Sequence, residues 1–310
     1  MFRTLTTNNS SCARWFRRRA SRHVSTQSPI IIGGSQRSGT TLMRVILDSH
    51  PRIACGPESS LLTGGFIPEN LSRRFDILLP EISRLRARAR DHAHFVEVFL
   101  TQYATNRGKG RWAEKTPQNV SYLPFIFRHF PAAKFIHLIR DGRDAVCSIR
   151  THPKFRIVDG RPVASNIHRP LRPCIQSWLR DTAAGMQWRG HPQYMEFHYE
   201  KLVSDLEPTL RRLCDFINEP WHPAMLEFHA QDEPSRDPTR FIANEAATQP
   251  LSRQALHRWR KELSADELQL FYCLAGKRMT ELGYEMDSDE STPLPNDERN
   301  AFATLKRGRP

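Results

Sequence analysis

The sequence lacks a long apolar run, an apolar leader and any cluster of cysteines. No stretch of the 310 residues approaches the roughly 20 consecutive apolar residues that a membrane-spanning helix needs, and the first residues lack the apolar block of a secretory signal. The 6 cysteines are scattered, without a CxxC pair and without histidines at metal-ligand spacing, so neither a disulfide framework nor a zinc site is indicated. We therefore expect a cytoplasmic protein with reduced thiols, no transmembrane span and no metal ion.

Acidic residues are fewer than basic ones. The chain carries 46 lysines and arginines against 33 aspartates and glutamates, which gives a formal net charge of +13. Residues 1–28 contain six of the arginines and no acid, and the rest of the chain keeps a positive excess. Such an excess favours anionic ligands. Because the other basic residues are interleaved with acids, a solvated basic surface is a more common outcome than a nucleic-acid interface, and we expect no nucleic-acid partner.

Both ends of the chain have the composition of disordered segments. Residues 1–28 are rich in Arg, Ser and Thr, and we predict a basic, disordered leader there. In a eukaryotic protein the same composition would suggest an organellar transit peptide. Residues 287–310 are acidic and contain proline, and we predict a disordered tail. This leaves residues 29–286 as one folded domain, which is long enough to bury a large core.

Between the two tails, strand patterns alternate with helical patterns. Ile30–Ile32, Lys134–Arg140 and Gln193–Tyr199 are short runs typical of buried parallel strands. The alternation predicts an α/β fold, a P-loop-type parallel sheet flanked by helices, in a single domain. The expected helices cover Thr40–Ser49, Pro80–Ala104, Pro117–Phe130, a segment from Asp144, a segment capped by Ser204 and Asp205, Gln254–Leu263 and Ala265–Leu282.

A glycine-rich loop, Gly34–Thr41 (GSQRSGTT), follows the first predicted strand and leads directly into a helix. Its glycines let backbone amides turn toward an anion, and the helix adds the positive end of its dipole. The spacing of the glycines matches a Walker A loop, but Thr40 occupies the place of the required lysine. Arg37 instead offers a planar, permanently charged group. The loop predicts a phosphate site, and a P-loop kinase or nucleotidase is one alternative.

Two segments resemble motifs of a known family. Gly33–Pro51 (GGSQRSGTTLMRVILDSHP) resembles the 5'-phosphosulfate loop of sulfotransferases that use 3'-phosphoadenosine 5'-phosphosulfate (PAPS), and is most similar to the tyrosylprotein sulfotransferase branch. Lys134–Ser148 resembles the 3'-phosphate motif of the same superfamily. The resemblance covers about residues 30–285. It implies transfer of the sulfuryl group of PAPS, as co-substrate, to a hydroxyl acceptor on a protein tyrosine, a carbohydrate or a small molecule, without a metal ion.

The resemblance also implies roles for individual residues. Glu58 matches the catalytic glutamate and would be the general base. Lys115, within WAEKTP, matches the active-site lysine and would stabilise the transferring group together with Arg37. The expected catalytic residues are Glu58, Lys115 and Arg37, and the expected cofactor-binding residues are Arg37, Ser38, Gly39, Thr40, Thr41, Arg140, Ser148 and Tyr199. Of these, Arg140 and Ser148 would bind the 3'-phosphate, and Tyr199 would lie against the adenine or its phosphate.

The sequence departs from the family pattern in three places. Pro57-Glu-Ser-Ser60 lacks the paired acids of the tyrosylprotein branch, so a tyrosine-peptide acceptor does not follow. Secretory members pair the cysteine that matches Cys55 with one whose place here is Ala113, which agrees with a reducing compartment. Residues 231–252 form a candidate lid. Ser235 and Gln249 fall near the serine and lysine of the family's lid, but the lysine is missing, and its chemistry is unassigned.

Several alternatives stay open on the sequence alone. A basic nucleic-acid-binding module could use the leader and the helix near Arg84–Arg90, although it would leave the phosphate loop unexplained. Arg150 or His152 would supply a further basic contact to the cofactor. The acceptor and the oligomeric state are not determined by the sequence, which allows a homodimer.

Overall fold

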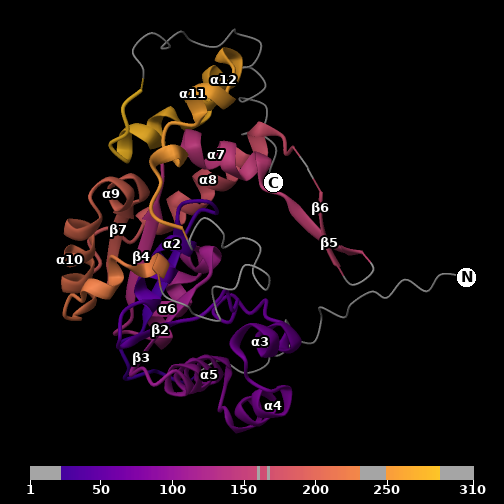
Figure 1. Ribbon diagram of the computed structural model, residues 1–310, viewed down its shortest axis with the longest axis vertical. Helices are drawn as coiled ribbons and strands as arrows, with labels where there is room; N and C mark the ends of the chain where they lie inside the picture. Colours follow the sequence, from indigo (N-terminus) through magenta and orange to yellow (C-terminus); the bar gives the residue numbers. More distant parts are fainter. Residues whose placement is uncertain (1–21, 159–160, 166–167, 231–248, 287–310) are drawn as a thin grey trace, which may run out of the picture. The chain divides into compact units, whose positions relative to one another are not determined.

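The structure is a computed structural model that describes residues 22–158, 161–165, 168–230 and 249–286, with only the backbone described at 154–158 and 161–165 (Figure 1). The chain forms two compact units. Unit 1 comprises Met1–Ile139 and Asp181–Arg253, and unit 2 comprises Arg140–Arg180 and Gln254–Pro310. Each unit has its own buried cluster, and the single domain over residues 29–286 stays a prediction.

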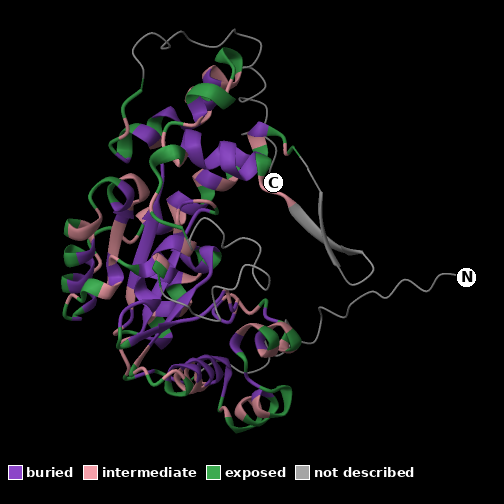
Figure 2. Ribbon diagram, viewed as in Figure 1, coloured by how far each residue is buried: buried purple, intermediate pink, exposed green. Residues whose placement is uncertain are grey.

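Unit 1 is built on a five-stranded parallel sheet with the strand order β2-β3-β1-β4-β7. The strands are β1 (Ile30–Gly34), β2 (Ile53–Cys55), β3 (Arg111–Lys115), β4 (Lys134–Ile139) and β7 (Tyr194–His198). All five residues of β1 are buried, as a central parallel strand requires, and Figure 2 shows the central strands as buried. The predicted α/β fold with a parallel sheet flanked by helices is confirmed. The sequence patterns did not predict β2 and β3.

Helices pack around this sheet. Those of unit 1 are α2 (Thr40–Asp48), α3 (Pro68–Phe75), α4 (Leu79–Arg88), α5 (His92–Asn106), η1 (Pro117–Tyr122), α6 (Leu123–His129), α9 (Tyr199–Ser204), α10 (Leu206–Ile217), η2 (Pro223–Met225) and η3 (Phe228–Ala230). The prediction of one long helix over Pro80–Ala104 is wrong. The chain breaks after α4, and Asp91 begins α5 by accepting a hydrogen bond from the backbone N of His94 at 3.0 Å.

The core of unit 1 joins the sheet to α5 and α6. Ile31 of β1 packs in the same buried cluster as Phe99 of α5 and Ile126 of α6, and none of the three has exposed surface. Each such side chain contributes about 1.5–3 kcal/mol by burial. This apolar layer holds β1, and with it the loop that follows, in a fixed place.

Part of the predicted leader packs on this core. The backbone N of His23 donates to Asp91 Oδ2 at 2.8 Å, and the backbone N of Ser25 donates to the carbonyl of His129 at 2.8 Å. The described chain therefore extends seven residues, from 22 to 28, into the segment that we predicted to be disordered. Residues 1–21 lie outside the described residues.

Unit 2 contains helices around a second, smaller core. Its elements are α7 (Gly142–Thr151), the antiparallel hairpin of β5 (Lys154–Val158) and β6 (Arg161–Ser165), the first ten residues of α8 (Leu171–Met186), α11 (Trp259–Glu262) and α12 (Ala265–Glu281), with η6 (Arg253–Ala255) at the boundary. Cys147, Trp259 and Leu268 form one buried cluster of this core. Within the described residues, no helix is both long and apolar enough to cross a membrane.

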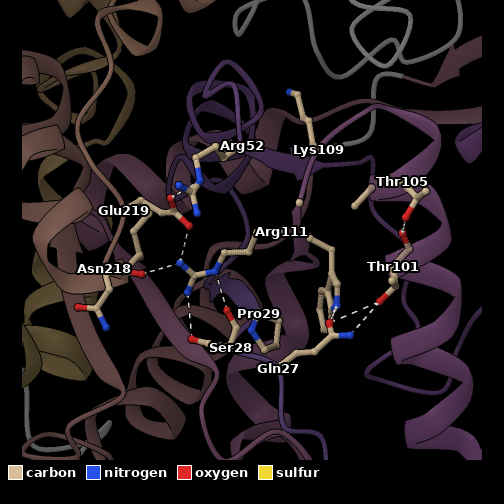
Figure 3. Close-up of a pocket in the computed structure, with 14 residues that line it drawn as sticks. Gln27, Ser28, Pro29, Arg52, Thr101, Thr105, Lys109, Arg111, Asn218 and Glu219 are labelled. Carbon is tan, nitrogen blue, oxygen red and sulfur yellow. Dashed lines mark hydrogen bonds and ion pairs between the residues drawn. The ribbon is translucent and has the colours of Figure 1, made fainter.

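A surface pocket of about 470 Å³ lies at the amino ends of the strands of unit 1 (Figure 3). Arg111, the first residue of β3, spans it: Nε donates to the carbonyl of Ser28 at 2.6 Å, and Nη1 donates to the carbonyl of Ile217 at 2.6 Å and to Glu219 at 3.1 Å. Ligands of parallel sheets bind beyond the carboxyl ends of the strands. This pocket is at the opposite edge, where Arg111 ties the entry to β1 to the end of α10.

Replacing Arg111 should destabilise the protein much more than replacing Arg52, which also pairs with Glu219. Arg111→Met leaves two carbonyls without this donor and the buried carboxylate of Glu219 paired with the exposed Arg52, and we expect the free energy of unfolding to fall by about 3 kcal/mol. The Arg52 side chain is 67% exposed, so Arg52→Ala should cost less than about 1 kcal/mol. Urea denaturation of both variants measures this. Equal losses would contradict the structural role of Arg111.

Candidate active site

The loop from β1 to α2 has a backbone that requires glycine at two points. Gly34 has a φ of 151°, and a Cβ atom there would lie 2.3 Å from the carbonyl oxygen of Leu138 in β4. Gly39, the N-cap of α2, has a φ of 92°, and a Cβ atom there would lie 2.4 Å from the ring of Tyr199. Larger residues would force either neighbour to move. The two glycines therefore fix the path of the loop.

Ser38 and the start of α2 provide donors for an anion. Ser38 is fully buried, and its Oγ has no hydrogen-bond partner among the described residues. Gly39 has no side chain with which to cap α2, so the first amides of the helix lack the acceptor that a serine or aspartate cap would supply. Free amides at a helix N-terminus favour phosphate or sulfate. The loop thus fits the anion that the sequence predicts for it.

Tyr199 lies against this loop. It is the first residue of α9, directly after β7, and its ring covers Gly39. The ring therefore supports the end of the loop from which α2 begins. The predicted contact of Tyr199 with adenine or its phosphate stays a prediction.

Lys115 and Glu58 meet beside the loop. The Nζ atom of Lys115, at the end of β3, donates to Glu58 Oε1 and also to Thr41 Oγ1, the latter at 3.2 Å. Lys115 is almost fully buried, whereas the side chain of Glu58 is 44% exposed. The carboxylate is thus open to a solvent-borne molecule, and the ammonium lies below it. Residues that are 57 positions apart in the sequence form one cluster.

The register of the sheet explains this meeting. Lys115 is the partner of Ile32 in β1, and Cys55, the last residue of β2, is the partner of Ala113 in β3. The carboxyl ends of β1, β2 and β3 therefore lie at one edge, and Glu58 follows β2 by three residues. The register also places Ala113 beside Cys55, where the resemblance expects the second cysteine of secretory relatives.

The charges around Glu58 favour its ionised form. Burial, the largest single effect, would raise the pKa of Glu58, but Lys115, Arg74 and Arg44 together lower that pKa below its ordinary value. Arg74 Nη1 also donates to the backbone carbonyl of Glu58 at 2.8 Å. A carboxylate that is ionised and accessible can take a proton from an incoming hydroxyl.

Sequence reasoning missed the residues that support this cluster. Glu114 is fully buried and accepts hydrogen bonds from the hydroxyls of Ser59 and Thr116 at 2.6 and 2.7 Å. It precedes Lys115 within the recognised WAEKTP segment, but a charged residue in a short strand gives no sign of burial. Arg74, on α3, lies in an Arg-rich stretch whose pattern does not distinguish one arginine from the next.

The predicted 3'-phosphate residues belong to unit 2. Arg140 is buried and directly follows the last residue of β4, and its Nη2 donates to the carbonyl of Ala255 and lies 4.0 Å from Asp144 Oδ2. Ser148 is buried within α7. Asp144 also accepts from the backbone N of His257 at 2.8 Å, which ties the start of α7 to the segment before α11.

The other residues predicted to contact the cofactor lie in unit 2 or in the candidate lid. Arg150 Nη2 donates to Glu267 of α12 at 2.8 Å, and His152 is the C-cap of α7. Gln249 is exposed. Ser235 and most of the candidate lid lie outside the described residues.

Comparison with protein families identifies the class of protein. A model described as "Sulfotransferase family" matches residues 29–223, which is more than half of the chain. The chain therefore belongs to the sulfotransferase family, and the predicted family is confirmed.

Similar proteins include protein-tyrosine sulfotransferases. The enzyme of Drosophila melanogaster is 28% identical over 270 residues, which cover 83% of this chain and 51% of the fly protein. Protein-tyrosine sulfotransferase 1 of Danio rerio is 28% identical over 267 residues, which cover 83% of this chain and 72% of the fish protein. The chain spans about half the length of the Drosophila relative.

Solved structures show the same fold. The sulfotransferase domain of the Synechococcus PCC 7002 olefin synthase has a TM-score of 0.59 at 20% identity, covering 87% of this chain and 99% of that domain. A mouse sulfotransferase complexed with PAP has a TM-score of 0.53 at 14% identity, covering 83% of this chain and 85% of the mouse protein. At these identities the likeness establishes the sulfotransferase fold.

Removing the charge of Lys115 should raise the pKa of Glu58. In Lys115→Met the strongest cation near Glu58 is lost while burial remains, so we expect the pKa of Glu58 to rise above that of the parent protein, where it is lowered. Carbon-13 NMR titration of the side-chain carboxyl groups, with Glu58→Gln to assign the signal, measures both. Arg73→Ala, which changes an exposed arginine on the same helix as Arg74, serves as the control. An unchanged Glu58 titration in Lys115→Met would contradict the pairing.

Substituting Gly39 should be more damaging than substituting Gly108. Both have positive φ, 92° and 66°, and so share the backbone strain of an added Cβ. A Cβ at Gly108 would have no atom within 4 Å, whereas one at Gly39 would meet Tyr199. We expect Gly39→Ala to lower the free energy of unfolding by at least about 1 kcal/mol more than Gly108→Ala. Urea denaturation of both variants measures this difference. Equal losses would contradict the close approach of the Tyr199 ring to Gly39.

Proposed function

We propose that this protein transfers the sulfuryl group of PAPS to a hydroxyl group of an acceptor. The observation that carries the proposal is the contact of Lys115 with both Glu58 and Thr41, which joins a base, a cation and the phosphate loop at one point. Sulfuryl transfer, like phosphoryl transfer, depends mainly on positioning and on stabilisation of charge, together with a base for the acceptor. The described cluster supplies each of these.

Glu58 acts as the general base. Its carboxylate is ionised at neutral pH because its pKa is lowered, and its partial exposure lets an acceptor reach it. Glu58 takes the proton of the acceptor hydroxyl while that oxygen forms a bond to sulfur. The Lys115 ammonium beside it keeps the carboxylate charged until the proton arrives.

Lys115 and Arg37 stabilise the leaving side of the reaction. As the new bond forms, the bond from sulfur to the bridging oxygen of the 5'-phosphate breaks, and that oxygen keeps the electron pair. Lys115 and Arg37 neutralise this developing charge. Ser38, Gly39, Thr40 and Thr41 hold the 5'-phosphate through their amides and hydroxyls. Adenosine 3',5'-bisphosphate leaves, and the acceptor carries the sulfate ester.

Arg140 and Ser148 bind the 3'-phosphate in this proposal, and Tyr199 contacts the adenine. An arginine and a hydroxyl are a suitable pair for a doubly charged phosphate. Arg140 comes directly after β4, and β4 pairs with β1 through Gly34 and Leu138. The phosphate loop and Arg140 therefore follow the carboxyl ends of neighbouring strands, the usual position for nucleotide ligands of such sheets.

The class of acceptor can be identified by an assay that follows the transfer of labelled sulfate. Relatives act on protein tyrosine, but the segment after Glu58 is Ser59-Ser60 and lacks the paired acids of that branch. Incubation with sulfur-35 PAPS and a tyrosine peptide, an oligosaccharide or 2-naphthol identifies the class by its labelled product. Loss of label transfer in Glu58→Gln is expected for whichever class reacts, and an unaffected Glu58→Gln would contradict the assignment of the base.

We also infer that the protein works in a reducing compartment. Cys55 is buried, and burial raises the pKa of its thiol and so disfavours the reactive thiolate. Its strand partner is Ala113, which cannot form a disulfide with it. Titration of unfolded protein from its native cells should find every cysteine as a free thiol. A disulfide in that material would contradict this inference.

Adenosine 3',5'-bisphosphate should bind, and Arg140→Ala should weaken the binding. Loss of a charge-assisted contact to phosphate corresponds to a decrease in affinity of roughly 10- to 100-fold. Calorimetric titration measures both proteins, with the exposed Arg180→Ala as a matched control that keeps the parent affinity. If the parent protein does not bind the nucleotide at millimolar concentration, the proposed function is wrong. If Arg140→Ala binds it as tightly as the parent protein does, the assignment of Arg140 to the 3'-phosphate is wrong.

A further inference from the structure

A buried carboxylate connects the two residues of the proposed catalytic pair. Glu114 lies in β3 next to Lys115, and only 1% of it is exposed. Its Oε1 accepts from Ser59 Oγ at 2.6 Å, from the backbone N of Ser59 at 3.4 Å and from Thr116 Oγ1 at 2.7 Å, and its Oε2 accepts from Asn119 Nδ2. In all four contacts the oxygens of Glu114 are the acceptors.

The donors of this network hold the loop that carries Glu58. Ser59 follows Glu58 directly, and its Oγ also accepts from the backbone N of Leu61 at 3.0 Å. The backbone N of Ser60 donates to Thr116 Oγ1 at 3.1 Å. Ser60 has a φ of 55°, a left-handed conformation that is unfavourable for serine and persists only where surrounding contacts enforce it. These hydrogen bonds fix the backbone next to Glu58 and so the direction in which its side chain extends from the loop.

The same network reaches the strand that leads into the phosphate loop. Asn119 Nδ2, which donates to Glu114, also donates to the carbonyl of Ile32 in β1 at 3.0 Å. Glu114 therefore joins three parts of the site: the loop with Glu58, the strand with Lys115 and the strand before Gly34. Because Glu114 is buried and engaged through both oxygens, an acceptor cannot use it as a base.

We propose that Glu114 is a positioning residue, whose carboxylate fixes the Glu58 loop against β3 and so sets the contact of Glu58 with Lys115. This inference rests on the proposed function, because it assigns Glu58 and Lys115 their roles. Glutamine has one acceptor oxygen where Glu114 has two, so it cannot keep all four contacts unchanged. In one orientation its amide NH₂ faces the NH₂ of Asn119, and in the other the Ser59 and Thr116 hydroxyls lose the oxygen to which they donate.

The first test is Glu114→Gln, assayed by transfer from sulfur-35 PAPS to the acceptor that reacts in the panel described above, or to water if none reacts. We expect kcat to fall roughly 10- to 100-fold, since a displacement of about 1 Å has that effect on a catalytic group. The Kd for adenosine 3',5'-bisphosphate should stay within about threefold of the parent value, because the nucleotide contacts proposed above are made by other residues. A parent-like kcat would overturn the inference.

A double-mutant cycle separates positioning from a general loss of stability. If Glu114 acts through Glu58, then Glu114→Gln in a Glu58→Gln background should lower kcat by less than about threefold further. Losses that multiply would show that Glu114 acts independently of Glu58 and would overturn the inference.

Thr116 provides a second pair of variants in case Glu114→Gln does not fold. Thr116→Val keeps the shape but loses the hydroxyl that joins Glu114 to Ser60, and should lower kcat. Thr116→Ser keeps the hydroxyl and should stay within about threefold of the parent. Equal kcat values for the two variants would contradict the inference. If the parent protein binds no nucleotide, the proposed function itself is wrong. Failure of the proposed function can therefore be distinguished from failure of the role assigned to Glu114.

Discussion

The parallel register of three neighbouring strands is the constraint on which the rest of the site depends. β2, β3 and β1 are aligned with Cys55 opposite Ala113 and Lys115 opposite Ile32, so their carboxyl ends reach the same edge of the sheet. The segments that follow β2 and β1 thereby come within reach of the last residue of β3. A slip of one residue in β3 would turn Lys115 to the other face of the sheet and separate it from Glu58.

The source of the positive charge at the phosphate loop distinguishes this site from that of a P-loop kinase. A Walker A loop carries its lysine directly after the second glycine, where this chain has Thr40, the first residue of α2. Here the ammonium comes from a different strand, as Lys115 of β3 contacts Thr41. Because Lys115 belongs to the neighbouring strand, it contacts both the loop and Glu58. A lysine in the first turn of α2 would not make both contacts. The arrangement therefore places cation and base together.

Local patterns predicted β1, β4 and β7 but missed β2, which has only three residues, and β3, which is mostly charged. β1 and β4 were evident as short apolar runs, whereas β3 reads Arg-Trp-Ala-Glu-Lys, and its charged residues are buried only through long-range partners such as Glu219 and Ser59. The site residues came from resemblance to a family. Their meeting was not predictable from spacing, because the contact of Glu58 with Lys115 depends on the order of strands in the sheet.

The measurement that tests the account most directly is a crystal structure with adenosine 3',5'-bisphosphate bound. The account predicts the 5'-phosphate within the loop Gly34–Thr41, at hydrogen-bond distance from Lys115 Nζ, with the 3'-phosphate on the guanidinium of Arg140. A nucleotide bound elsewhere, for example in the pocket at Arg111, would contradict the account. So would a nucleotide whose 5'-phosphate lies in the loop while its 3'-phosphate is remote from Arg140.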